Sequence, residues 1–207
     1  NGPGQIESVH LAAGSSPLAK LAGQNAVAAN QPPQRLRYLQ TLFSRGVTGN
    51  LHRRAVQLHG NVRTLYGPVD AWEQTLHLAP GEEPAPHTVY VECETLGVSE
   101  SPSASLFTPP GSGNGLGPLE LTAEGSVTIE GQTPEHGAFT ARGARATYDQ
   151  LKTMFVLEGL PNAPAKIWRQ EYVGAPHTVG SAQKIQYWLN TGRAAGKGFR
   201  WEIHEFQ

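Results

Sequence analysis

Short stretches of alternating apolar and polar residues dominate the chain from residue 119 to residue 189. They read LELTAEGSVTIEG, FTARGARATYDQLKTMFVLEG, APAKIWRQ and GSAQKIQYWL, and each ends at Gly, Pro, Asn or a charged turn. A period of two places successive side chains on opposite faces of a strand. The pattern therefore predicts an all-β fold of many antiparallel strands, with less than about a tenth of the residues in helix.

The same alternation predicts which side chains face the core. A slip of one residue would bury the intervening polar side chains, so the apolar positions of each strand share one face. Residues expected to point inward are Leu119, Leu121, Val127, Ile129, Ile185, Tyr187 and Leu189.

The first half of the chain carries weaker strand signals. AVQLHGNVRTLYG (55–67) alternates around a turn or bulge at Gly60-Asn61, and further strands are predicted at 69–80 and 88–98. The run RLRYLQTLF (35–43) fits a helix or a strand, because periodicity cannot separate the two over so short a length.

Two segments are predicted to be loops. Residues 12–30 are rich in Ala, Gly and Ser, with a helical turn at 18–21 as the alternative. Residues 99–118 are rich in Gly, Pro and Ser, which predicts a long flexible loop. The GSGNGLG run inside it lacks the spacing of a dinucleotide-binding fingerprint.

The two halves of the chain resemble each other. Gly60-Asn61-Val62 aligns with Gly125-Ser126-Val127, and Trp72 aligns with Tyr148. Repeats of one unit that cannot bury its own apolar face stack into a continuous core. We therefore expect one elongated domain, residues 1–207, with a first, divergent repeat at 35–98, the flexible loop at 99–118 and a second repeat at 119–207.

Composition restricts the classes of function. The 207 residues are 38% hydrophobic, include 24 Gly and 16 Pro, and carry a formal net charge of −1. This balance suits thin sheets with many turns and provides no basic field for nucleic acid. The chain opens without Met or a signal peptide, so we expect a piece of a longer protein or a processed form.

No recognisable catalytic or metal motif interrupts the strands. The single Cys93 lies in an alternating stretch and is interpreted as an apolar strand residue, with a reactive thiol as the alternative. The eight His lack metal-ligand spacing. We therefore expect no enzyme activity, no cofactor, no metal and no catalytic residue. The acidic residues Glu73, Glu124, Glu130, Asp149 and Glu158 are expected on hydrated strand faces rather than in a catalytic pair.

Aromatic residues gather toward the C-terminal end. They either fill the core or stack against a sugar or lipid. The last segment, FRWEIHEF (199–206), alternates well and is expected to be an edge strand whose free backbone groups pair with a partner. The clustered aromatics are Trp168, Tyr172, Tyr187, Trp188 and Trp201.

Four short motifs resemble, in order and spacing, the OstA-like repeat of the bacterial lipopolysaccharide-transport proteins. They are EGSV at 124–127, ARATYD at 144–149, LEG at 157–159 and AQKIQY at 182–187. The resemblance covers residues 119–189 well and 36–98 more loosely. The chain departs from the compact bridge protein of that family by insertions at 12–33 and 99–118.

This resemblance implies a β-taco, or β-jellyroll, of two facing antiparallel sheets with an apolar trough between them. It further implies a non-enzymatic periplasmic protein of the cell envelope. Its partners would be lipopolysaccharide or another amphipathic lipid in the trough, and other OstA-like β-modules at the edge strands. The residues expected to line the trough are Val127, Ile129, Phe139, Tyr148, Leu157, Ile167, Ile185 and Tyr187.

Two other functions fit the same strands. A carbohydrate-binding or carbohydrate-cleaving jelly roll would present exposed aromatics flanked by acids. A purely structural envelope module would have a closed core and no ligand.

Overall fold

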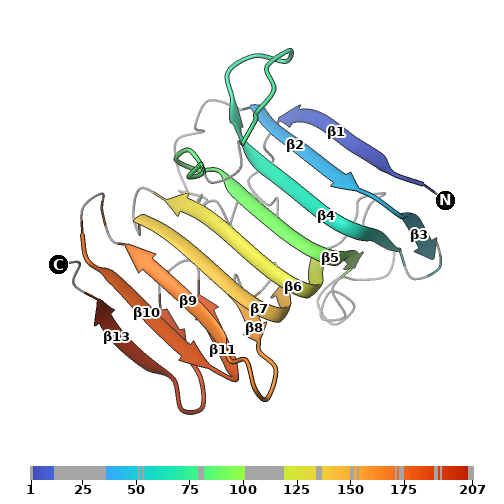
Figure 1. Cartoon of the computed structure of the whole chain (residues 1–207). Helices are drawn as coiled ribbons and strands as arrows, with labels where there is room; N and C mark the ends of the chain where they lie inside the picture. The colour runs from blue at the N-terminus through green and yellow to red at the C-terminus, as the bar shows by residue number, and fades with distance from the viewer. Residues whose placement is uncertain are drawn as a thin grey trace, which may run out of the picture.

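Thirteen antiparallel strands form one continuous sheet in the described part of the chain (Figure 1). The computed structural model describes residues 2–11, 36–50, 52, 54–78, 82–100, 119–133, 137–149, 152, 154–170, 172, 175–188, 191 and 193–204. No helix occurs among these residues, and residues 56–189 lie mostly in strands, as the alternation predicts.

The strands vary greatly in length, and the four longest, β4 to β7, are consecutive. The bounds are β1 Gly4–Leu11, β2 Leu36–Phe43, β3 Gly46–Asn50, β4 Ala55–Val69, β5 Val89–Glu100, β6 Leu119–Thr133, β7 Gly137–Asp149, β8 Met154–Glu158, β9 Ala165–Gln170, β10 His177–Ala182, β11 Lys184–Trp188, β12 Arg193–Ala195 and β13 Arg200–His204.

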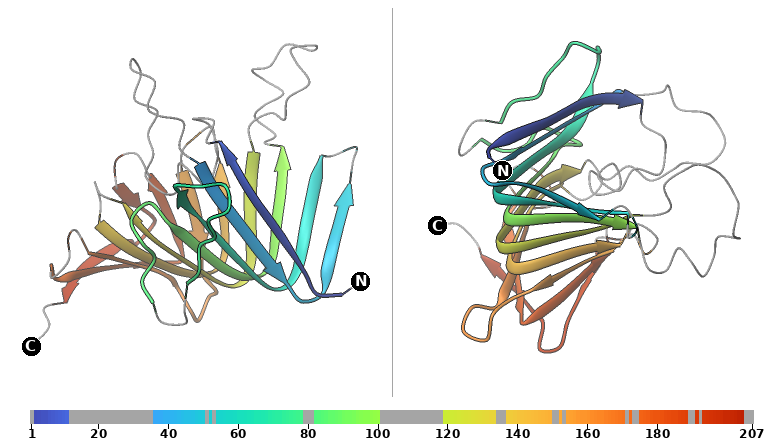
Figure 2. Two further views of the ribbon diagram at one scale, coloured as in Figure 1. Left: turned by 90° about the horizontal axis from the view of Figure 1, so that it is seen from above. Right: turned by 90° about the vertical axis from the view of Figure 1, so that its right-hand side faces the viewer.

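The sheet folds into two facing layers because each of these four long strands runs through both. Layer I consists of β1, β2, β9, β10 and β13, joined to 62–69 of β4, 89–93 of β5, 127–133 of β6 and 137–143 of β7. Layer II consists of β3, β8, β11 and β12, joined to the other parts of the long strands. Figure 2 shows the layers diverging from the line of bends. The predicted β-jellyroll of two facing antiparallel sheets is confirmed.

Paired left-handed residues mark the bends of β4 and β6. Gly60 and Asn61 have φ angles of 83° and 43°, and Gly125 and Ser126 have φ angles of 80° and 49°. The strand register shifts at both places. A bulge of this kind adds an unpaired residue and bends the strand sharply. The aligned triplets of the two halves therefore adopt the same local conformation.

Space as well as backbone angle requires glycine at these bends. A Cβ on Gly125 would lie 2.6 Å from the Cβ of Glu94, and a Cβ on Gly60 would lie 2.5 Å from the Ser44 Oγ. At both bends, atoms of a neighbouring segment thus leave no room for a Cβ.

Apolar side chains of both layers fill the space between them. Val127 and Ile129 are buried, as are Ile185 and Tyr187, which confirms the predicted parity. Leu121 is half-buried and packs against the same core. Leu119 is also half-buried, and Leu189 lies outside the described residues.

The prediction of a strand at 69–80 is wrong beyond Val69. Residues 70–78 lie outside strands because a local turn takes up their backbone groups. The Asp70 amide donates to the Gln74 Oε1 at 2.7 Å, and the Gln74 amide donates to the Ala71 carbonyl at 3.2 Å. Such local bonds compete with a sheet ladder. The predicted equivalence of Trp72 and Tyr148 is also wrong, since Trp72 is exposed in this turn and Tyr148 is buried in β7.

The other predicted boundaries differ only slightly from those in the structure. The ambiguous run at 35–43 is a strand, β2, which pairs with both β1 and β4. Ser99 and Glu100, predicted to open a loop, instead end β5. Residues 12–35 and 101–118, with the predicted loops and the helical turn, lie outside the described residues.

Replacing Gly125 by Ala should lower the free energy of unfolding by about 1–3 kcal/mol, because it strains both φ and the contact with Glu94. Gly97→Ala is the matched control, since a Cβ there would find its nearest neighbour at 3.6 Å. We expect the control to be neutral or stabilising. Urea denaturation measures both, and equal losses would contradict this account of the bend.

Candidate functional site

An apolar pocket of about 210 Å³ lies between the two layers and is lined by strands from β1 to β8. Apolar cavities of about 150 Å³ already bind solutes the size of benzene. Its walls come from β1, β2, β4, β5, β6, β7 and β8. The apolar side chains that line it include Ile6, Leu39, Val56, Leu58, Val91, Leu96, Val98, Leu121, Ala123, Ile129, Ala146 and Phe155.

Two buried threonines in the pocket wall form a hydrogen bond with each other. Thr41 of β2 and Thr64 of β4 face across neighbouring strands, with their hydroxyl oxygens 3.1 Å apart. Because the pair consumes a donor and an acceptor internally, these side chains present mainly their methyl groups. The wall therefore stays apolar.

Stacked aromatic rings close the pocket toward the C-terminal half. The ring centroids of Phe155 and Tyr187 lie 5.0 Å apart, and Phe139 of layer I lies 6.4 and 6.2 Å from them. These bulky rings fill the space between the layers. Beyond them the core is tight, with Ile167 and Ile185 fully buried.

The opposite end of the pocket opens at the first strands. Ile6 of β1 is 42% exposed and Val56 of β4 is 42% exposed, although both line the pocket. Val47 of β3, beside Leu58, is also exposed. Large apolar side chains that remain in contact with water mark a surface suited to an apolar partner.

A buried hydroxyl at the pocket lacks a hydrogen-bond partner. Tyr148 lines the pocket and is only 4% exposed, yet its hydroxyl makes no hydrogen bond within the described part of the chain. Burial raises the pKa of this phenol above its usual value, and the Asp149 carboxylate adds to the shift. The hydroxyl therefore stays protonated and can donate to a bound acceptor.

The eight residues predicted to line a trough are all buried between the layers. Only Ile129 and Tyr148 line the open pocket. Phe139 and Tyr187 belong to the aromatic stack that closes it. The rest belong to the core cluster away from this pocket, namely Val127, Leu157, Ile167 and Ile185.

The pocket draws most of its lining from residues that sequence analysis did not select. Ile6, Leu39 and Val91 belong to the first half of the chain, where the family resemblance is loose. Val56 and Leu58 alternate with polar residues in the sequence. This pattern could have been used to predict pocket residues in the first half of the chain.

Cys93 behaves as a core residue. Its side chain is 3% exposed, and burial raises the pKa of its thiol to about 12. The nucleophilic form of cysteine is the thiolate, which this environment disfavours. The interpretation of Cys93 as an apolar strand residue thus fits its surroundings.

The clustered aromatics do not form one surface. Tyr187 is buried, Tyr172 is 67% exposed, and Trp168 faces outward from layer I. Trp201 packs edge-on against Phe199 with centroids 5.0 Å apart. Only Trp168 borders a pocket described here.

Within the described ranges, no three His, Cys, Asp or Glu side chains are grouped so that they could hold a metal ion. No helix among those residues has the length and apolar character needed to cross a membrane.

Comparison with known proteins finds similarity in structure but not in sequence. No protein-family model matches the chain, and no curated protein matches its sequence. Among solved structures, LptH of Pseudomonas aeruginosa is similar over 82% of this chain and 95% of its own length, with 11% sequence identity and a TM-score of 0.49. LptH is described as the LptA-homologous periplasmic component of the lipopolysaccharide transport device.

Replacing Tyr148 by Phe should raise the free energy of unfolding by about 1 kcal/mol, because it removes a buried hydroxyl without a partner. Tyr90→Phe is the matched control, since the Tyr90 hydroxyl donates to Glu92 at 3.2 Å. We expect the control to lose about 0.5–1.5 kcal/mol. Thermal or urea denaturation measures both, and a loss of stability in the Tyr148 variant would contradict the assignment of an unpaired hydroxyl.

Proposed function

We propose that this chain is a non-enzymatic module of the bacterial cell envelope, of the lipopolysaccharide-transport type and working in the periplasm. Its apolar pocket shelters acyl chains of lipopolysaccharide or a comparable amphipathic lipid. Its free edge strands join it to other β-modules. The OstA-like motifs, Glu124 to Val127 and those that follow, support the transport type.

The observation that carries the lipid proposal is the open apolar pocket between the layers. Moving an acyl chain from water into an apolar pocket is favourable by about 0.8 kcal/mol of free energy for each buried methylene group. The exposed pair Ile6 and Val56 provides an apolar opening for the chain. Tyr148 provides a hydroxyl that can donate to an ester or carboxyl oxygen of the lipid.

The free edges support joining to other β-modules. Within layer I, β1 pairs only with β2 and β13 pairs only with β10 in the described part of the chain. These strands lie at opposite ends of the sheet (Figure 1). Each leaves one row of backbone donors and acceptors that another strand can pair with.

Replacing Val56 by Glu should weaken binding of a fluorescent fatty-acid probe at least about tenfold, because it puts a charge at the opening of the apolar pocket. Leu160→Glu is the matched control: this apolar residue is 56% exposed in the turn between β8 and β9 and does not line the pocket. The control should bind as the parent chain does.

Displacement by lipopolysaccharide identifies the ligand in the same titration. Purified lipopolysaccharide should compete with the probe. If saturating probe and lipopolysaccharide leave both fluorescence and melting temperature unchanged, the pocket is an internal void and the structural-module alternative is correct.

Replacing Ile203 by Pro should reduce self-association or pairing with a neighbouring module, because proline removes a donor and distorts the β13 ladder. This substitution retains Phe199, which packs against the core. Sedimentation velocity over a range of concentrations measures the effect, with circular dichroism as the check on folding. An unchanged sedimentation profile, from a parent chain that does associate, would place assembly on another surface.

A further inference from the structure

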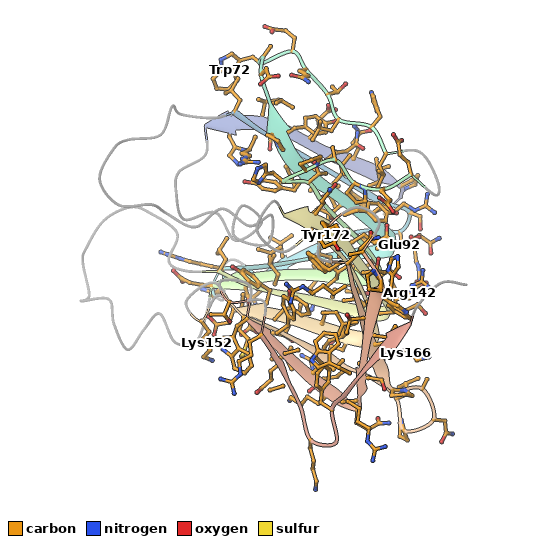
Figure 3. The ribbon with its side chains drawn as sticks, turned by 90° about the vertical axis from the view of Figure 1, so that its left-hand side faces the viewer. Trp72, Glu92, Arg142, Lys152, Lys166 and Tyr172 are labelled. Carbon is orange, nitrogen blue, oxygen red and sulfur yellow. The ribbon has the colours of Figure 1, made fainter. Side chains whose placement is uncertain are left out.

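A second hollow, here called the outer groove, lies on the face of layer I that points away from the apolar pocket. Its volume is about 590 Å³, within the range of small-molecule sites. Outward side chains of β2, β4, β5, β6, β7 and β9 form its floor. Leu78, Glu82, Glu83 and Pro84, from the loop between β4 and β5, form its cover. Figure 3 shows Glu92 and Arg142 along this side of the molecule.

Backbone hydrogen bonds hold the covering loop against the sheet. The His87 amide donates to the Gln132 carbonyl at 2.8 Å, and the Gln132 amide donates to the Thr88 carbonyl at 3.4 Å. Gly67 admits the loop, because a Cβ there would lie 2.7 Å from a methyl group of Leu76. These contacts hold the loop against layer I at Leu76 and at residues 87–88, on either side of the groove residues.

The strand register places two aromatic residues in one row across the floor. Tyr90 is opposite Glu130, Glu130 is opposite Thr140, and Thr140 is opposite Trp168. Neighbouring strands lie about 4.8 Å apart, so the two aromatic positions are separated by about 14 Å. A pyranose ring is roughly as long as one strand spacing, so roughly four sugar units would reach from one ring to the other.

Ion pairs and a cation–π contact hold the floor side chains in place. Arg63 lies 3.2 Å from the Glu92 carboxylate, which also accepts a hydrogen bond from the Tyr90 hydroxyl. The Arg142 guanidinium lies 5.6 Å from the Trp168 ring centroid. Side chains fixed in this way lose little conformational entropy when a ligand binds.

The charges of the groove select a ligand without negative charge. Its lining includes two arginines, Arg63 and Arg142, against four glutamates. The glutamates, with the amides of Gln40, Gln132 and Gln170, supply many hydrogen-bond acceptors. A phosphate or sulfate group would meet more carboxylates than guanidinium groups, whereas sugar hydroxyls donate readily to carboxylates.

We propose that the outer groove binds a neutral oligosaccharide of about four units, with sugar rings stacked on Trp168 and Tyr90 and hydroxyls bonded to Glu130 and its neighbours. A peptide strand is a poorer ligand, because the floor strands are already paired on both sides and offer no free backbone row. The site is independent of the proposed lipid pocket, which lies on the opposite face of layer I.

Isothermal titration calorimetry with four neutral tetrasaccharides tests the proposal: cellotetraose, maltotetraose, mannotetraose and chitotetraose. At least one should bind with a Kd below about 1 mM. The corresponding disaccharide should bind at least about tenfold more weakly, because it cannot reach both aromatic rings.

Matched tryptophan variants locate the binding. Trp168→Ala should weaken binding of that tetrasaccharide at least about tenfold, while Trp72→Ala, an exposed residue outside the groove, should leave it unchanged. Glu130→Gln, which preserves shape, should weaken it several-fold. All three variants should keep the circular dichroism spectrum and fatty-acid probe binding of the parent chain.

Three results would overturn the proposal. These are no heat of binding with any neutral tetrasaccharide, equal binding by the Trp168 and Trp72 variants, and preferential binding of a sulfated tetrasaccharide. None of them bears on the lipid pocket, whose probe binding is measured separately.

Discussion

The structure depends on the left-handed bulges that bend β4 and β6. Left-handed residues at Gly60-Asn61 and Gly125-Ser126 let each strand leave one layer and enter the next, with the hydrogen-bonded ladder interrupted only at the bulge and resumed beyond it. A bend of this kind makes two facing layers from one sheet. Inward side chains of the two layers then pack against one another, and a core forms without helices in the described part of the chain.

Unequal filling of that interior creates the candidate site. Phe139, Phe155 and Tyr187 stack across the layers and close the C-terminal half. Smaller aliphatic side chains in the N-terminal half leave an apolar pocket that reaches the surface at Ile6 and Val56. Since the pocket and the aromatic stack share Phe155, the ring cluster sets the depth to which a ligand can enter.

Where a strand is hydrogen-bonded on both sides, the alternation of apolar and polar residues correctly predicts which side chains point inward. Val127 and Ile129 point inward as predicted, because a shift of one residue would bury their polar neighbours. Residues 70–78 look similar in sequence, but local side-chain and backbone bonds end the strand there. The pocket could not be predicted, because residual volume depends on which side chains meet across the layers. The division into repeats at 35–98 and 119–207 stays a prediction.

Methyl NMR with a spin-labelled fatty acid tests the central claim most directly, namely that a lipid chain enters the apolar pocket and not the core beyond the aromatic stack. Ile6 and Ile129 line the pocket, whereas Ile167 and Ile185 belong to the closed half. Labelled δ1 methyl groups of Ile6 and Ile129 should broaden more strongly than those of Ile167 and Ile185 when 16-doxyl-stearate is added, and unlabelled stearate should only shift them. Equal broadening of all four methyl groups, or none, would contradict the account.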